Sequence, residues 1–242
     1  MISRNCRIAL LAVCLTLLLC GGALAASLTI HAPEEAKQGS AVKVRVVIDE
    51  QLPQITFTWL GKNIAAPTVA DGGRRIAEAL LPVPVNAGKD LIVQATAGTL
   101  TGKATVKVLK VKWPEQQISV KKTFVNPPKE AMKRIDAERK KSSEAINRVT
   151  PERYWRGEFQ RPVPGVVTSA FGGRRMFNGE LRSYHRGVDL RGAEGTPIKA
   201  VADGKVAIAQ NMYFAGNTVY LDHGQGVVSS YAHMSRLDVK PG

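Results

Sequence analysis

The stretch His185-Arg186-Gly187-Val188-Asp189 places an imidazole and a carboxylate four positions apart, with a glycine between them. A catalytic zinc ion binds side chains of these types, because such a site has three protein ligands and one open position. On a straight strand the two Cα atoms would lie about 13 Å apart, at about 3.3 Å per residue, which is too far for ligands of one metal. The segment must therefore bend, and we expect Gly187 to permit the bend by adopting a positive φ.

Further blocks surround this stretch in the last third of the chain. They are Ser169-Ala170-Phe171-Gly172-Gly173-Arg174-Arg175, Gly195-Thr196-Pro197-Ile198-Lys199-Ala200, Asp203-Gly204-Lys205-Val206, Gly216-Asn217-Thr218-Val219-Tyr220-Leu221-Asp222-His223-Gly224-Gln225-Gly226 and Ser230-Tyr231-Ala232-His233-Met234. Together with the first stretch, and in this order, they resemble the lysostaphin/LytM-type zinc endopeptidases, which cut the peptide cross-links of bacterial cell walls.

The resemblance implies a Zn²⁺ cofactor, with His185 and Asp189 as metal ligands and His233 as a catalytic histidine near the metal-bound water. The third ligand of the family is the second histidine of an H-x-H pair, and the sequence reaches Gly242 without that pair. The family pattern has further strands after this point, and a sheet that halted here without them would leave open edges, which folded proteins normally cover. We therefore favour a chain that is C-terminally truncated before H-x-H over one that naturally ends at Gly242.

The other histidines are interpreted without a metal. His223 precedes Gly224-Gln225-Gly226 and is predicted to be a turn residue, because the family does not use this position on zinc. His31 stands alone beside a predicted strand, where solvent exposure or a hydrogen bond accounts for it. Tyr184 is adjacent to His185, whereas the family's oxyanion tyrosine lies a few residues before the first ligand, so that role is not transferred.

The fold class is predicted to be mainly β. Residues 27–111 alternate apolar and polar side chains in segments such as 42–46 and 55–59, with turn signals between them, which is typical of an immunoglobulin-like β-sandwich. Residues 163–242 are predicted to form the N-terminal part of an antiparallel peptidase domain. Its expected strands are 166–169, 198–201, 205–208, 218–221 and 227–231, with Asn178-Gly179 as a hairpin turn.

Residues 112–162 are predicted to form a linker with a basic helix over about 127–148. Asn126 is the expected N-cap, and Met132, Ile135, Ile146 and Val149 are the expected apolar stripe. The helix is interpreted either as an arm for anionic polymer or, preferably, as a solvated linker. Tyr154, Trp155 and Phe159 are expected to dock the linker onto the last domain.

Residues 1–25 are typical of a signal peptide, with Arg4 and Arg7 before an apolar run and Ala23-Leu24-Ala25 at its end. An uncleaved membrane anchor is the alternative; after cleavage no stable membrane span is expected. All three cysteines lie in this segment, so the mature chain would have no disulfide. These features indicate a periplasmic or secreted protein of the cell envelope.

The net charge of +14 raises the question of nucleic-acid binding, but only 6% of residues are aromatic and no stacking platform is apparent. We therefore expect no nucleic-acid partner and interpret the charge as affinity for the anionic envelope. Two functions follow. The first is a zinc endopeptidase acting on peptidoglycan cross-link peptides. The alternative is a non-catalytic domain that binds the wall or activates another hydrolase. Other proteins of the cell envelope are candidate partners, and the sequence identifies none of them.

Overall fold

The structure, a computed structural model, describes residues 26–118, 127–177 and 179–242 and is mainly β. The predicted signal segment with its cysteines, the expected N-cap Asn126 and the turn residue Asn178 lie outside these ranges. Helix α2 is the one helix among the described residues. Within those residues, no helix has both the length and the apolar content needed to cross a membrane.

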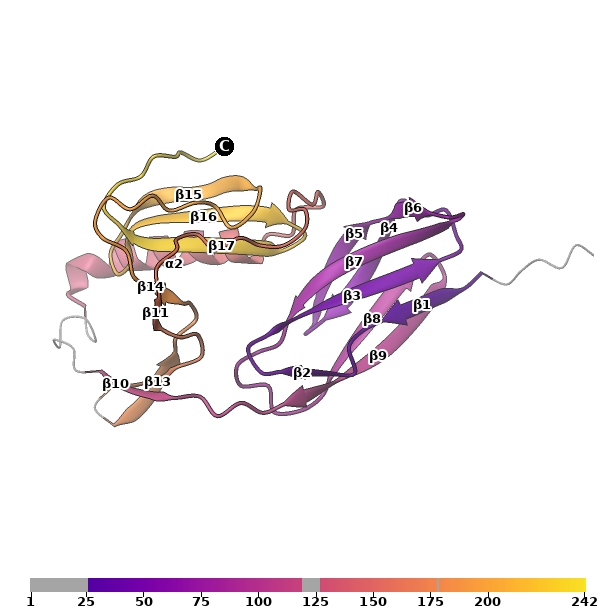
Figure 1. The fold of residues 1–242 in the computed structure, drawn as a ribbon, viewed down its shortest axis with the longest axis horizontal. Coiled ribbons are helices and arrows are strands. Elements are labelled where there is room, and N and C mark those ends of the chain that lie inside the picture. Colours follow the sequence, from indigo (N-terminus) through magenta and orange to yellow (C-terminus); the bar gives the residue numbers. More distant parts are fainter. Residues whose placement is uncertain (1–25, 119–126, 178) are drawn as a thin grey trace, which may run out of the picture.

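Two sheets form a sandwich in the N-terminal half, to the right in Figure 1. In spatial order, one sheet holds β1 (Leu28–His31), β3 (Ala41–Ile48), β7 (Arg74–Pro82) and β6 (Val69–Asp71). The other holds β2 (Glu35–Lys37), β9 (Leu100–Leu109), β8 (Leu91–Ala97), β4 (Gln54–Trp59) and β5 (Lys62–Pro67). The predicted strands at 42–46 and 55–59 are therefore confirmed within β3 and β4.

The core of the sandwich lies between these sheets, where alternate side chains of both are buried. Val44, Val46, Phe57 and Val93 are fully buried. Because burying a side chain of this size contributes about 1.5–3 kcal/mol, packing can hold this half together without a disulfide.

Three small sheets form the C-terminal unit. The first contains β10 (Glu115–Ile118), β12 (Arg174–Phe177) and β13 (Glu180–Tyr184), and the second contains β11 (Val167–Ser169) and β14 (Asp189–Leu190). The third contains β15 (Lys205–Met212), β16 (Gly216–Gly224) and β17 (Val227–Met234). A strand predicted at 198–201 is wrong: this segment donates and accepts single backbone bonds with Pro162 and Gln160 but forms no ladder.

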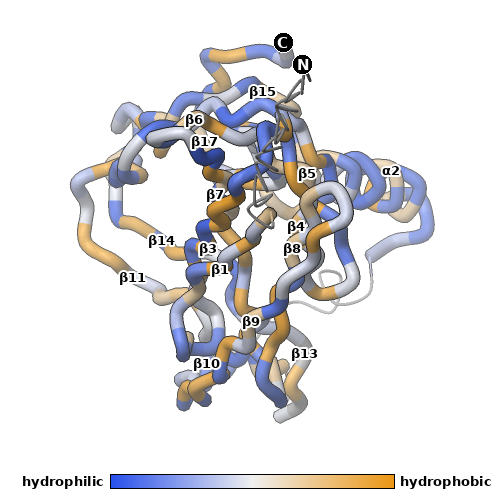
Figure 2. Tube along the Cα trace, turned by 90° about the vertical axis from the view of Figure 1, so that its right-hand side faces the viewer, coloured by the Kyte–Doolittle hydropathy of each residue, from blue (hydrophilic) through white to orange (hydrophobic). Residues whose placement is uncertain are grey.

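Helix α2 (Lys129–Asn147) packs one side on β15 and β17, while most of its residues are exposed, so it is largely solvated but does not stand free of the sheet. Pro128 occupies the N-cap position without a side-chain cap bond. Ile135 and Ala145 are the buried residues of the helix, whereas Ile146 of the expected stripe is exposed. Most of the helix is hydrophilic (Figure 2), and Arg134 and Lys141 bind Asn211 and Gln210 of β15.

The linker after α2 also docks, as predicted from its aromatic residues. The backbone N–H of Tyr154 donates to the carbonyl of His223, 2.9 Å away. Trp155 packs on Phe159, and Phe159 meets the ring of His223 edge-on with centroids 5.9 Å apart. These contacts fix the linker to the sheet of β15, β16 and β17.

Trp113 joins the sandwich to the C-terminal unit. Its Nε1–H donates to the carbonyl of Val85, 3.0 Å away, and its ring meets Phe171 edge-on. A Cβ built on Gly39 of the sandwich or on Gly172 of the C-terminal unit would lie 2.9 or 2.0 Å from the indole. Both glycines have positive φ, 76° and 86°. The indole therefore occupies space that only glycine on each side leaves open.

Gly172→Ala should lower the free energy of unfolding by more than the about 1–2 kcal/mol that positive φ alone costs an L-residue, because its methyl group would overlap Trp113. Gly195→Ala is the matched control, since Gly195 has nearly the same φ and open space around it. Urea unfolding followed by tryptophan fluorescence measures both. Equal losses in the two variants would show that the indole is not confined.

Candidate metal centre

His185 lies in the bend between β13 and β14, where two backbone hydrogen bonds hold it in place. The N–H of His185 donates to the carbonyl of Gly173, 2.7 Å away, and the N–H of Gly172 donates to the carbonyl of His185, 2.8 Å away. This pairing fixes His185 against the loop that follows β11. The residue as a whole is only 6% exposed.

The ring of His185 has one nitrogen turned inward. Nδ1 lies 2.9 Å from the carbonyl oxygen of Ala170 and 3.1 Å from Oγ of Ser169. A carbonyl oxygen can only accept, so Nδ1 carries the hydrogen and donates it. In the neutral ring Nε2 then has a free lone pair, as a metal ligand needs.

Asp189 completes a pair of donors with His185. Its Oδ1 lies 3.2 Å from Nε2 of His185, and its side chain is 54% exposed. Two ligands bound about 2.0–2.1 Å from a tetrahedral metal lie about 3.3 Å apart, which matches this separation. Both atoms are acceptors when the ring is neutral and the carboxyl is ionised, so a metal ion between them would satisfy both. The pair therefore fits one edge of a zinc site.

The bend between the two donors is present, but Gly187 does not make it in the expected way. Gly187 has no positive φ, and a Cβ there would stand in ordinary contact with Nε2 of His185, at 3.7 Å. The prediction of a left-handed glycine is wrong. Instead, register pairing of Asp189 with Ser169 in β11, beside an irregularity of that strand, turns the segment back.

The described residues supply no third donor beside this pair. Nowhere in the described ranges do three His, Cys, Asp or Glu side chains gather as a metal site. His233 is exposed at the end of β17, where its φ of 58° is unusual for a residue other than glycine. Its N–H donates to the carbonyl of Ala215, 2.9 Å away.

His223 is buried in β16 and is not the predicted turn residue. It has no exposed surface, its Nδ1 lies 2.7 Å from the carbonyl oxygen of Asp203, and its Nε2 lies 2.8 Å from Oγ of Ser229. Nδ1 must donate to the carbonyl, so Nε2 accepts from the hydroxyl of Ser229. Ser229 Oγ is also 3.0 Å from Oη of Tyr231. Both ring nitrogens of His223 are thus occupied within the protein.

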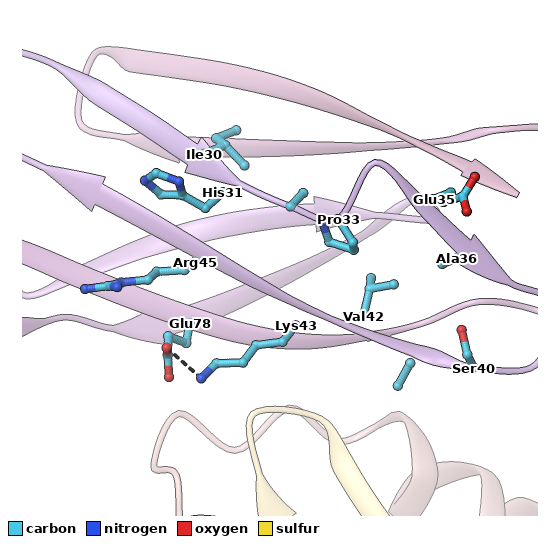
Figure 3. Close-up of a pocket in the computed structure, with 12 residues that line it drawn as sticks. Ile30, His31, Pro33, Glu35, Ala36, Ser40, Val42, Lys43, Arg45 and Glu78 are labelled. Carbon is cyan, nitrogen blue, oxygen red and sulfur yellow. Dashed lines mark ion pairs between the residues drawn. The ribbon is translucent and has the colours of Figure 1, made fainter.

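A hollow of about 790 Å³ lies on the sandwich, where its lining includes His31. Figure 3 shows Lys43 paired with Glu78 in this hollow, at 2.9 Å. Burial acts to raise the pKa of Glu78, but bonds and charges from Lys43 and Arg153 outweigh it and lower the pKa below the usual value. The charges therefore neutralise one another, and Arg153 ties Glu78 to the linker after α2.

Sequence reasoning missed two side chains near His185. Ser169 lies behind the ring, and Gln116 of β10 donates from its Nε2 to Oγ of Ser169, 3.0 Å away. Ser169 belongs to one of the blocks that resemble the peptidase family, and that membership is the signal by which it could have been found. Gln116 carries no comparable signal, because it reaches the site only through pairing of β10 with β12.

Comparison with known proteins finds similarity between the C-terminal unit and a family of peptidases. Residues 183–242 match the model of peptidase family M23. A crystal structure of a Pseudomonas aeruginosa protein described as an M23 peptidase superposes with a TM-score of 0.61 at 28% identity, covering 83% of this chain and 75% of that one.

Two curated relatives each match about a third of the chain. Peptidoglycan DD-endopeptidase ShyC of Vibrio cholerae is 38% identical over 78 residues, which is 31% of this chain and 18% of the relative. Murein hydrolase activator EnvC of Escherichia coli is 36% identical over 87 residues, which is 36% of this chain and 20% of the relative. The chain thus spans at most a fifth of the length of either.

Proposed function

We propose that this chain, whose residues 183–242 match the model of peptidase family M23, is part of a zinc-dependent endopeptidase that hydrolyses the peptide cross-links of bacterial peptidoglycan. The observation that carries the proposal is the pair of acceptors formed by His185 Nε2 and Asp189 Oδ1, 3.2 Å apart, with the opposite ring nitrogen anchored on Ala170. A metal ion between the two acceptors satisfies both.

In this proposal His185 and Asp189 hold the metal. When bound, zinc lowers the pKa of its water towards 7 and polarises the carbonyl of the scissile bond. The anchored Nδ1–H of His185 keeps Nε2 directed at the metal position and prevents the ring from rotating. Asp189, more than half exposed, leaves the outer side of the site open to a wall peptide.

His233 is proposed as the residue that moves a proton to the leaving amine. It is exposed, as a group that reaches substrate must be, and its positive φ is a form of backbone strain that clusters at functional sites. The predicted site would act in the cell envelope, either in the periplasm or after secretion. The basic surface of the chain suits that anionic setting.

A second candidate function is a non-catalytic domain that binds the wall or activates another hydrolase. It is favoured by the absence of a third donor beside His185 and Asp189 among the described residues. The likeness to a relative named as a murein hydrolase activator points the same way.

Purified wall sacculi distinguish the two candidates. The proposed peptidase, tested as the full-length protein, should release soluble muropeptides on its own, and a chelator should stop the release until zinc is restored. Residues 27–242, which bring only two described donors together, should release none. The activator should release none alone, but should accelerate a separate murein hydrolase mixed with it. Chelator-insensitive release would contradict the zinc assignment.

A further inference from the structure

We infer that Gln116, in the strand that leaves the sandwich, is a positioning residue for the metal ligand His185 and acts through Ser169. The inference rests on the proposed function, because it concerns the same metal pair. It adds that the linker is part of the site.

A path of side chains joins Gln116 to His185. The amide Nε2 of Gln116 donates to Oγ of Ser169 over 3.0 Å, and that oxygen lies 3.1 Å from Nδ1 of His185. Ser169 is also the register partner of Asp189. One serine therefore contacts the ring of one metal donor, stands opposite the other in the strand pair, and receives its remaining bond from the linker.

Gln116 controls the orientation of the Ser169 hydroxyl. A serine hydroxyl can donate or accept, and its hydrogen rotates to suit its partners. With the Gln116 N–H as one donor, Oγ presents its other lone pair to Nδ1–H of His185. Without Gln116 the hydroxyl is free to rotate, and the Ala170 carbonyl, 2.9 Å away, is then the one fixed acceptor of Nδ1–H. The ring is held by one firm bond instead of two, so Nε2 is less firmly directed at the metal position.

Strand pairing brings Gln116 beside Ser169. Strand β10 pairs in parallel with β12, setting Gln116 opposite Arg175, while Glu115 forms an ion pair with Arg174 at 2.6 Å. The amide of Gln116 lies over Gly173, where an added Cβ would stand 3.3 Å from it. Gly173 is also the residue whose carbonyl accepts from the N–H of His185.

Trp113 connects the site to the sandwich. Trp113, three residues before Gln116, is confined between Gly39 of the sandwich and Gly172 of the C-terminal unit. A displacement of the sandwich therefore pulls on the strand that carries Gln116. We therefore expect the geometry of His185 and Asp189 to depend on the position of β10. The sandwich acts on the pair only through Trp113 and Gln116 and does not contact it along this path.

The test compares Gln116→Met with wild type in the full chain. Methionine keeps the length and packing of glutamine but cannot donate to Ser169. Gln117→Met is the matched control, because Gln117 is the exposed neighbour in the same strand. In the metal-free protein, long-range ¹H–¹⁵N correlation spectra of the histidine rings report which nitrogen of His185 carries the hydrogen. Zinc affinity is measured by calorimetry, and thermal unfolding checks the fold.

Wild type and Gln117→Met should show His185 with hydrogen on Nδ1. Gln116→Met should keep the hydrogen on Nδ1 but shift the resonance of that nitrogen, because the second acceptor of Nδ1–H is no longer held in place. Zinc affinity should fall about tenfold, the low end of the effect of outer-shell partners. Ser169→Ala should produce a similar loss, and the double variant little more, because the two residues act in series.

The outcomes separate this inference from the proposed function. Altered ring spectra in Gln116→Met, with no zinc binding by wild type, would support the positioning role and count against the zinc site. Unchanged spectra and an affinity within twofold of wild type would overturn the positioning role while leaving the zinc site intact. A fall in thermal stability without any change in the ring spectra would also overturn it.

Discussion

Replacing His185 by alanine should remove zinc binding from the chain altogether. The wild-type chain has two protein donors beside one another, His185 Nε2 and Asp189 Oδ1, and water would fill the rest of a tetrahedral shell. Binding should therefore be weaker than in a complete site, yet measurable. With one exposed carboxylate left, the loss should exceed the about 10–100-fold that removal of an outer-shell partner costs.

Calorimetric titration of zinc into residues 27–242 checks this result. His31→Ala is the control, because His31 is an exposed histidine of the sandwich and should leave the affinity unchanged. The same chain should release no muropeptides from sacculi, since a catalytic zinc normally has three protein ligands. Tight stoichiometric binding by wild type, or lytic activity, would reveal a third donor that the described arrangement does not bring to the pair.

Local patterns predicted much of the fold because they report local physics. The alternation in 42–46 and 55–59 has the period of a half-buried strand, and these residues lie in β3 and β4. The segment 198–201 is equally apolar and extended, but its backbone bonds go to the linker around Gln160 and Pro162. A pattern read along one segment carries no record of which distant segment lies beside it.

In the candidate site, too, the local spacing of residues was predictable and the contacts with distant segments were not. The spacing of His185 and Asp189 predicts that they meet, and they do, at 3.2 Å. The cause differs from the expected one, because strand pairing with Ser169, and not a left-handed Gly187, turns the chain. The contribution of Gln116 depends on a parallel pair between segments far apart in sequence. Such a pair leaves no mark in the residues around 116.

His223 presents the sharpest difference between sequence and structure, and it supports the second large prediction. His223→Ala should destabilise the C-terminal unit by about 3–5 kcal/mol, the range for removing a large buried ring. The ring has no exposed surface and packs against Phe159. Its loss would leave a cavity and deprive the Asp203 carbonyl and the Ser229 hydroxyl of their partner, at about 1–3 kcal/mol for each polar group left unsatisfied.

Urea unfolding of the full chain, followed by the fluorescence of Trp155 in the docked linker, measures this loss. His233→Ala is the matched control: it removes an exposed imidazole from β17, two residues after Tyr231, and should change stability by less than about 0.5 kcal/mol. Ser229→Ala should fall between the two, because it removes one partner of the ring and leaves the ring in place. Zinc affinity decides the role of the histidine. If His223→Ala abolished zinc binding while keeping wild-type stability, His223 would be a metal ligand, contrary to a ring whose two nitrogens are both bonded within the protein.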